Sequence, residues 1–209
     1  MDIIEGSIDD LNIIYERYEK DFPADERKDR KQLESLMGGY KYKLLIAKDF
    51  ILKEILGYAF IYENENSRVI WIDYIAIYPK FQSKGYGTLF FNKIIERRNN
   101  VKGIMVEVEE ANHVNKKIRE KQKRRIDFYK RIGAHRLNID YYLPIKDGSI
   151  PLDLYFIPKE GVKYLSKEVL RNQIYSVFQF IHGDIEHRSV VFSKITESID
   201  DEYFSQCNN

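Results

Sequence analysis

The sequence predicts an α/β fold of the α+β type, a central mixed sheet of six to seven strands flanked by helices, with a C-terminal helical extension. Its centre is Val69–Ile77, a run of β-forming apolar residues interrupted only by Asp73, as is typical of a buried internal strand. Pro79 ends the run because proline has no N–H to donate to a neighbouring strand. A glycine turn, a helical stretch and another strand follow, which predicts a right-handed crossover between parallel strands.

Three strands and two helices are predicted before or beside this central strand. Ser7 is expected to cap the first helix, and Phe22-Pro23 to end it. The connectors between the later strands are short and polar, so antiparallel pairing with the central strand is expected. In order, the predicted elements are the strand Met1–Glu5, the helix after Ser7, the helix Asp25–Met37, and the strands Tyr42–Asp49 and Glu54–Glu63.

Further strands and a long amphipathic helix are predicted after the crossover. We expect residues 1–158 to form one domain and residues 159–209 to form the helical extension. The apolar residues of this extension need a cover, which either the domain or a second subunit in a homodimer would provide. The later elements are the strands Gly103–Glu110, His135–Tyr142 and Pro151–Ile157, and the helix Val162–Ile181.

Composition narrows the class of protein. A net charge of +1 argues against binding to nucleic acid, which usually requires a basic excess. The single cysteine, Cys207, allows no disulfide framework and predicts a reducing compartment. No signal peptide and no membrane span are expected, so the prediction is a soluble cytoplasmic protein without membrane partners. The histidines lack the spacing of metal ligands, so no metal site is expected.

The turn Gln82–Thr88 is a candidate anion site. Gly85 and Gly87 allow positive φ and a close approach of the backbone to a phosphate. The N–H groups of the first helical turn have no intrahelical partner, and the helix dipole adds positive potential. The alternative is a turn that needs glycine only for its geometry. Neither a Walker loop nor the dinucleotide fingerprint is present.

This turn fits the pattern [RQ]-x-x-G-x-[GA], and a later helix ends in a phrase close to F-Y-x-x-x-G-F, with Ala134 at the last position. The matching residues are Gln82, Gly85 and Gly87 in the first motif, and Phe128, Tyr129 and Gly133 in the second. Together these motifs resemble the GNAT superfamily of acyl-CoA-dependent N-acyltransferases over residues 1–157. The resemblance implies an acetyltransferase that moves an acetyl group from acetyl-CoA to a primary amine by direct attack in a ternary complex.

The resemblance also implies roles for particular residues. Tyr129 would stand beside the sulfur as the general acid, with core packing as the alternative. Family members often read N-x-x-A-x-x-F-Y, whereas this chain has Gln122 and Arg125 at the first two defined positions. The pantetheine arm would pair with the backbone of Ile75, Ala76 and Ile77. The pyrophosphate would be held by the amides of Gln82, Ser83, Lys84, Gly85, Tyr86, Gly87 and Thr88.

A carboxylate base is expected because an amine with a pKa near 10.4 costs roughly 4.6 kcal/mol to deprotonate at pH 7. The candidates are Asp73 on the central strand, and Glu107 and Glu109 on one face of the next. We predict Asp73 and Glu107 as catalytic, and Glu109 with Tyr141 as substrate-binding. In the alternative, Asp73 pairs with a backbone N–H or a lysine, the glutamates lie at a solvated sheet end, and Tyr141 has an ordinary packing role.

Three alternatives concern function. The chain could be a non-catalytic acyl-CoA-binding or regulatory module with the same fold. The basic segment Lys116–Arg125 could hold the CoA 3′-phosphate or nucleic acid, or be a solvated helix start. Acidic residues of the first helices could attract a cationic acceptor or lie on a solvated face, namely Glu19, Asp21, Asp25 and Glu26.

Overall fold

A computed structural model describes residues 1–24, 26–49, 51 and 53–204 of the chain. The chain forms two units. The first comprises Met1–Glu63 and Ile72–Asn99, and the second comprises Asn64–Trp71 and Asn100–Asn209. Asp25 and Cys207, both named above, lie outside the described residues.

The strands form one mixed eight-stranded sheet in the order β1-β2-β3-β4-β5-β8-β6, with β7 paired to β8. This arrangement confirms the α/β fold class. Their bounds are β1 Asp2–Gly6, β2 Tyr42–Asp49, β3 Glu54–Asn64, β4 Val69–Ile77, β5 Gly103–Val108, β6 His135–Arg136, β7 Tyr141–Ile145 and β8 Gly148–Pro158.

The strand count of six to seven was too low, because the stretch predicted as one strand, His135–Tyr142, forms parts of β6 and β7. Leu137 still donates its N–H to the Leu154 carbonyl of β8 at 2.8 Å, but the next backbone N–H groups in this stretch bond to the C-terminal segment. The N–H of Asn138 donates to the Glu202 carboxylate at 2.5 Å, and the N–H of Asp140 donates to the Ser198 hydroxyl at 2.9 Å. These partners lie about sixty residues away, so no local pattern could indicate them.

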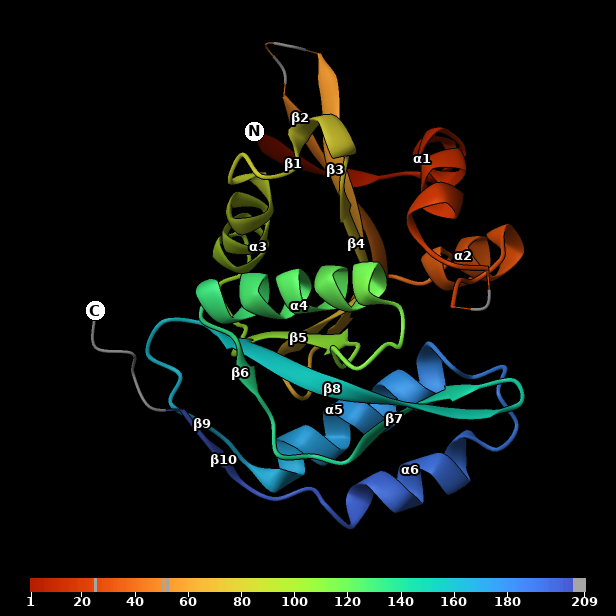
Figure 1. Cartoon of the computed structure of the whole chain (residues 1–209), viewed down its shortest axis with the longest axis vertical. Helices are drawn as coiled ribbons and strands as arrows, with labels where there is room; N and C mark the ends of the chain where they lie inside the picture. Colours follow the sequence, from red (N-terminus) through yellow and green to blue (C-terminus); the bar gives the residue numbers. More distant parts are fainter. Residues whose placement is uncertain (25, 50, 52, 205–209) are drawn as a thin grey trace. The chain divides into compact units, whose positions relative to one another are not determined.

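In the first unit, α1 (Ile8–Asp21) and α2 (Arg30–Met37) lie on one side of the strands and α3 (Tyr86–Glu96) on the other, as Figure 1 shows. Ser7 caps α1 as predicted, accepting a hydrogen bond from the Asp10 N–H at 3.2 Å. The second helix begins at Arg30, later than predicted, because Asp29 caps it by accepting from the Gln32 N–H at 2.9 Å.

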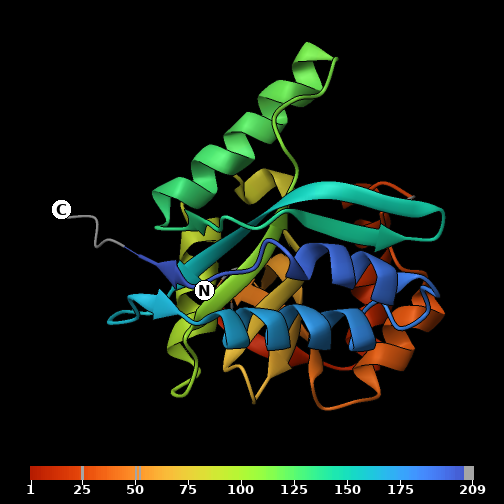
Figure 2. The ribbon, with the colours of Figure 1, turned by 90° about the horizontal axis from the view of Figure 1, so that it is seen from below.

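In the second unit, α4 (Lys116–Arg131) lies on one side of β8, and α5 (Lys167–Phe180) and α6 (Arg188–Thr196) lie on the other (Figure 2). The helix predicted from Val162 begins at Lys167 instead, because Ser166 caps it and β9 (Tyr164–Leu165) pairs with β10 (Glu202–Tyr203). The described residues of the 159–209 segment belong to this unit, and buried α5 residues include Leu170, Ile174, Val177 and Phe178. Packing of this segment on a second subunit stays a prediction.

Candidate active site

The turn before α3 presents an uncapped helix N-terminus. A short 3₁₀ turn, Pro79–Phe81, follows β4, and the side-chain amide of Gln82 then donates to the Ile77 carbonyl at 2.8 Å. This bond closes the turn onto the end of β4. Gly85 is the N-cap of α3 and provides no side-chain cap for the first N–H groups of the helix. An anion can therefore be accepted at this exposed helix start.

The backbone of the turn differs from the expectation at one glycine. Gly85 has a positive φ of 83°, as expected, but Gly87 lies inside the first turn of α3 with helical geometry. The second left-handed residue is instead Ser83, at φ 60°. A left-handed non-glycine residue costs about 1–2 kcal/mol, so the surrounding turn must hold Ser83 in place.

The C-terminal end of β4 is held from one side by β3. A Cβ atom added at Gly57 would lie 2.4 Å from the Ala76 carbonyl oxygen, and the Tyr78 N–H donates to the Leu56 carbonyl at 2.9 Å. Ile75, Ala76 and Ile77 are half-buried, whereas β4 is mostly buried before them. The strand end predicted to contact pantetheine is therefore fixed in place yet partly accessible.

Asp73 is a buried carboxylate that already has two partners. Its side chain is 4% exposed, accepts a hydrogen bond from the Tyr42 hydroxyl at 2.5 Å, and lies 3.3 Å from the Lys28 ammonium. Burial, followed by the charge of Asp73, raises the pKa of Tyr42 well above that of an ordinary phenol, so Tyr42 is a neutral donor. The lysine partner considered for Asp73 from the sequence is thus present.

Lys28 and Tyr42 are the residues of this cluster that the sequence did not indicate. Lys28 also connects the α1–α2 loop to β4, because its backbone N–H donates to the Tyr18 and Tyr74 hydroxyls at 2.9 and 3.2 Å. Its ammonium lies 5.4 Å from the centre of the Tyr74 ring. In the sequence Lys28 is one of many charges in a polar segment, and only the fold brings it to Asp73.

Glu107 and Tyr141 lie together, although 34 positions separate them in the sequence. The Tyr141 hydroxyl donates to the Glu107 carboxylate at 2.5 Å. The sheet register explains the contact, because β8 lies between β5 and β7 and pairs Leu154 with Glu107 and Leu152 with Tyr141. Side chains two residues apart on a strand share a face, so the side chains of Glu107 and Tyr141 reach the same side of β8.

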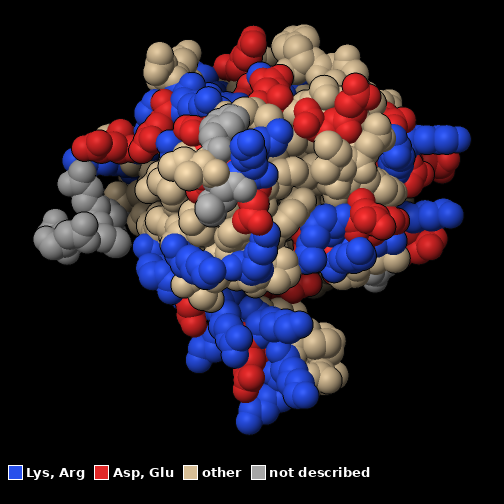
Figure 3. All heavy atoms as spheres, turned by 90° about the horizontal axis from the view of Figure 1, so that it is seen from above, with Lys and Arg blue, Asp and Glu red and all other residues tan. Residues whose placement is uncertain are grey.

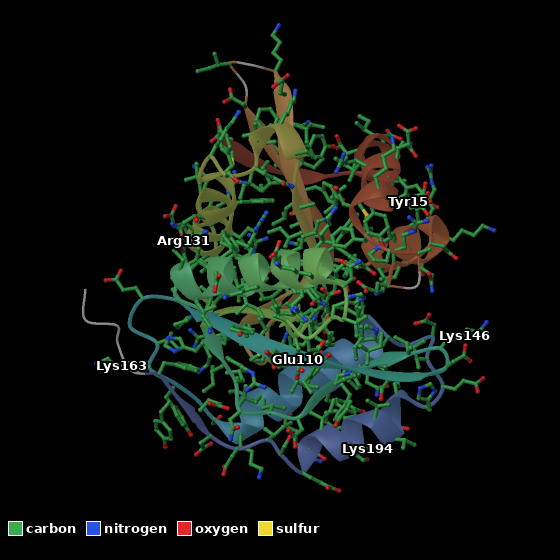
Figure 4. The ribbon with its side chains drawn as sticks, viewed as in Figure 1. Tyr15, Glu110, Arg131, Lys146, Lys163 and Lys194 are labelled. Atoms are coloured by element: carbon green, nitrogen blue, oxygen red, sulfur yellow. The ribbon has the colours of Figure 1, made fainter. Side chains whose placement is uncertain are left out.

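Glu109 does not join this pair. The strand predicted to reach Glu110 ends at Val108, so Glu109 lies beyond β5. Glu110, which is labelled in Figure 4, follows Glu109 in the connection after the strand. The Glu109 carboxylate lies 3.3 Å from the Arg125 guanidinium of α4. Arg125 occupies one of the two positions where the chain departs from the usual family motif. The substrate-binding role of Glu109 stays a prediction.

Tyr129 is buried on α4, with 5% of the residue exposed and its ring stacked on Tyr155 at 6.2 Å. Burial raises the pKa of Tyr129 to about 12, partly offset by the positive charge of Arg125. The phenol therefore keeps its proton at neutral pH and can act as a hydrogen-bond donor. Packing and acid catalysis are compatible with this placement.

The basic segment forms the exposed first half of α4. Asn115 caps the helix by accepting from the Lys117 N–H at 2.9 Å, and the buried Gln122 amide oxygen accepts from the His113 N–H at 3.3 Å. Gln122 therefore holds the connection before the helix. Figure 3 shows Lys and Arg side chains gathered on the projecting lobe that α4 forms.

The acidic residues of the first helices largely have cationic partners. Arg17 donates to the Asp21 carboxylate at 2.9 Å, and the Tyr58 hydroxyl donates to the same carboxylate at 3.0 Å. Glu19 lies 3.4 Å from Arg27. These contacts reduce the negative potential that a cationic acceptor would meet.

Within the described ranges, no three or more histidine, cysteine or acidic side chains are grouped as a metal site would require. Among the helices that the structure describes, none combines the length and apolar character needed to cross a membrane.

The mixed sheet of this chain, with its glycine turn at the start of α3, fits the N-acyltransferase class of folds. The sequence matches the Acetyltransferase (GNAT) family over residues 11–134, more than half of its length, and the chain belongs to this family. No curated protein matches the sequence.

Solved structures show the same fold. A protein from Bacteroides thetaiotaomicron, described as an acetyltransferase of the GNAT family, superposes with a TM-score of 0.70 at 21% identity, covering 88% of this chain and 99% of that one. The dodecameric spermidine N-acetyltransferase of Vibrio cholerae superposes with a TM-score of 0.55 at 15% identity, covering 75% and 92%. The chain is therefore an acyltransferase of the GNAT family.

Proposed function

We propose that the chain transfers an acetyl group from acetyl-CoA to a primary amine of a small molecule or peptide, by direct attack in a ternary complex. The observation that carries the proposal is the uncapped N-terminus of α3 behind Gly85, which supplies amides for a pyrophosphate. Family membership supports acetyl-CoA as the cosubstrate. Neighbours that acetylate spermidine support an amine acceptor. A cytoplasmic location and a homodimer are part of the proposal, and light scattering would test the assembly.

In this mechanism the acceptor ammonium first passes a proton to a carboxylate, the resulting amine nitrogen attacks the thioester carbonyl, and the C–S bond then breaks to release the CoA thiolate. Glu107 is the preferred base because it is half-buried rather than enclosed and accepts a hydrogen bond from the Tyr141 phenol. Asp73 is the second candidate, already paired with Lys28. Tyr129 donates its proton towards the departing sulfur.

The decisive experiment measures release of free CoA thiol from acetyl-CoA in the presence of polyamines, amino acids and short peptides. An amine-dependent release above the rate of hydrolysis is expected. A non-catalytic module would bind acetyl-CoA in calorimetry and release no thiol with any amine. Steeply salt-dependent binding of a nucleic acid, without thiol release, would instead favour an adaptor that uses α4.

A charge placed at Gly87 is expected to separate cofactor binding from stability. In Gly87→Glu, the new carboxylate lies in the first turn of α3, where it favours the helix but repels a pyrophosphate. We expect acetyl-CoA affinity to fall at least tenfold, about 1.4 kcal/mol, with no loss in melting temperature. Gly87→Lys is the matched control, equally bulky but cationic. Equal affinity losses in both variants would mean that bulk, and not charge, is what the site excludes.

Tyr129→Phe is expected to lower kcat about tenfold and leave the acetyl-CoA dissociation constant unchanged. The effect is modest because protonating a thiolate with a pKa near 8.5 at pH 7 involves only about 2 kcal/mol. Phenylalanine preserves the stacking on Tyr155, so the fold should be unaffected. Stopped-flow or steady-state thiol release would measure the change, and an unaltered kcat would remove Tyr129 from the role of acid.

A further inference from the structure

Helix α5 contacts the aromatic residue that holds the proposed base. The Tyr141 ring has Trp71 at 6.0 Å and Phe178 of α5 at 6.2 Å, the latter in an edge-on arrangement. All three residues are almost fully buried. Because close-packed rings have few alternative positions, Phe178 restricts where the Tyr141 hydroxyl can point.

The same helix also fixes the turn that leads into β4. The Ser67 hydroxyl donates to the Gln173 side-chain oxygen at 2.5 Å, and the Val69 N–H donates to the Ser67 oxygen at 3.2 Å. Gln173 is fully buried, and within the described residues its amide nitrogen has no partner. An apolar residue at position 173 would avoid the cost of burying this amide nitrogen without a partner. We therefore infer that the hydrogen bond from Ser67 to the Gln173 oxygen offsets that cost.

We propose that α5 positions Glu107 for catalysis by holding Tyr141, with Phe178 as the positioning residue and Gln173 supporting the start of the strand that carries Trp71. The inference rests on the proposed function, because it assigns the base of that reaction. Glu107 is the catalytic residue, and Phe178 acts only through Tyr141. Both Tyr141 and α5 lie beyond residue 134, where the match to the family ends.

The physical basis is orientation. A hydroxyl that donates at 2.5 Å restricts the rotation of the Glu107 carboxylate and therefore the direction in which its oxygens can accept a proton. Displacement of a catalytic group by about 1 Å can cost up to 10²-fold in rate, even when the mutation lies away from the chemistry. Shortening Phe178 leaves space beside the Tyr141 ring, so the hydroxyl and the carboxylate gain alternative positions.

A double-mutant cycle on the full-length chain tests this coupling. Phe178→Leu is expected to lower kcat about fivefold to tenfold in the wild-type background, with acetyl-CoA affinity unchanged. In the Tyr141→Phe background, which keeps the ring but lacks the hydroxyl, the same change should alter kcat less than twofold, because the contact it supports is already absent. Leu170→Val is the matched control, since Leu170 is buried on α5 about two turns before Phe178.

A failure of this inference can be distinguished from a failure of the proposed function. Equal losses of kcat from Phe178→Leu in both backgrounds, or a similar loss in Leu170→Val, would show a general packing effect and overturn the role of α5. If the wild type releases thiol but the two substitutions act additively on kcat, the proposed function still holds and only the role of α5 is overturned. A wild type that releases no thiol overturns both the proposed function and the role of α5. If Phe178→Leu does not fold, Phe178→Met preserves more volume, and the same non-additivity with Tyr141→Phe is required of it.

Discussion

Glu107→Gln is expected to lower kcat by about 10²- to 10³-fold, the largest effect on activity among the substitutions considered. Glutamine has the size of glutamate, and its amide oxygen can still accept the hydrogen bond of the Tyr141 hydroxyl. It cannot accept, at neutral pH, the proton that the acceptor ammonium must lose before its nitrogen can attack. We therefore expect an unchanged melting temperature and an unchanged affinity for acetyl-CoA, with the loss confined to turnover measured by thiol release.

Asp73→Asn is the comparison that decides which carboxylate is the base. Asparagine keeps the acceptor for the Tyr42 hydroxyl but leaves the Lys28 ammonium without its counter-charge, so the main expected effect is lower stability. A larger loss of kcat in Asp73→Asn than in Glu107→Gln, in samples shown to be folded at the assay temperature, would transfer the role of base to Asp73.

Lys28→Met is expected to lower the free energy of unfolding by about 3 kcal/mol, because it leaves a buried carboxylate without its cation. The Asp73 side chain is 4% exposed and that of Lys28 is 11% exposed, so water compensates little for the loss. Methionine retains most of the length and apolar contact of the lysine stem. For a chain of this size, the melting temperature should fall by roughly 6–12 °C, measured by calorimetry.

Lys31→Met is the matched control, since Lys31 is an exposed lysine close by on α2. Its effect should stay within about 0.5 kcal/mol, as for most surface substitutions. Adding Asp73→Asn to Lys28→Met removes the unpaired charge and should recover part of the lost stability. Equal melting temperatures for Lys28→Met and the wild type would mean that Tyr42 alone satisfies Asp73.

Local sequence patterns predicted most of the helices and strands whose bounds depend on their own residues. The apolar run of β4 matches its predicted bounds, and Ser7 caps α1 where the capping pattern places it. The errors have two sources: a local helix cap at α2 and distant hydrogen-bond partners between β6 and β7. Asp29, four positions after the predicted start, caps α2. Between β6 and β7, Asn138 and Asp140 donate their N–H groups to Glu202 and Ser198, so the chain leaves the sheet there.

The candidate site divides in the same way. The glycine turn was readable because an approach to phosphate requires glycine at fixed spacing next to a helix start, and Gly85 has the expected positive φ. Glu107 and Tyr141 were each proposed from their own strands, but not as a pair. The environment of Asp73 needed Tyr42 and Lys28, which no spacing rule connects to it.

By itself, the amino-acid sequence determined the α/β class and the position of the central strand, because hydrophobic periodicity acts over a few residues. Its two short motifs also gave the resemblance to the GNAT family. Only the tertiary structure decided which carboxylates have cationic partners, and that α5 covers the aromatic residue beside Glu107. The physical reason is that burial and pairing depend on sheet register and helix packing, which join residues far apart in the chain.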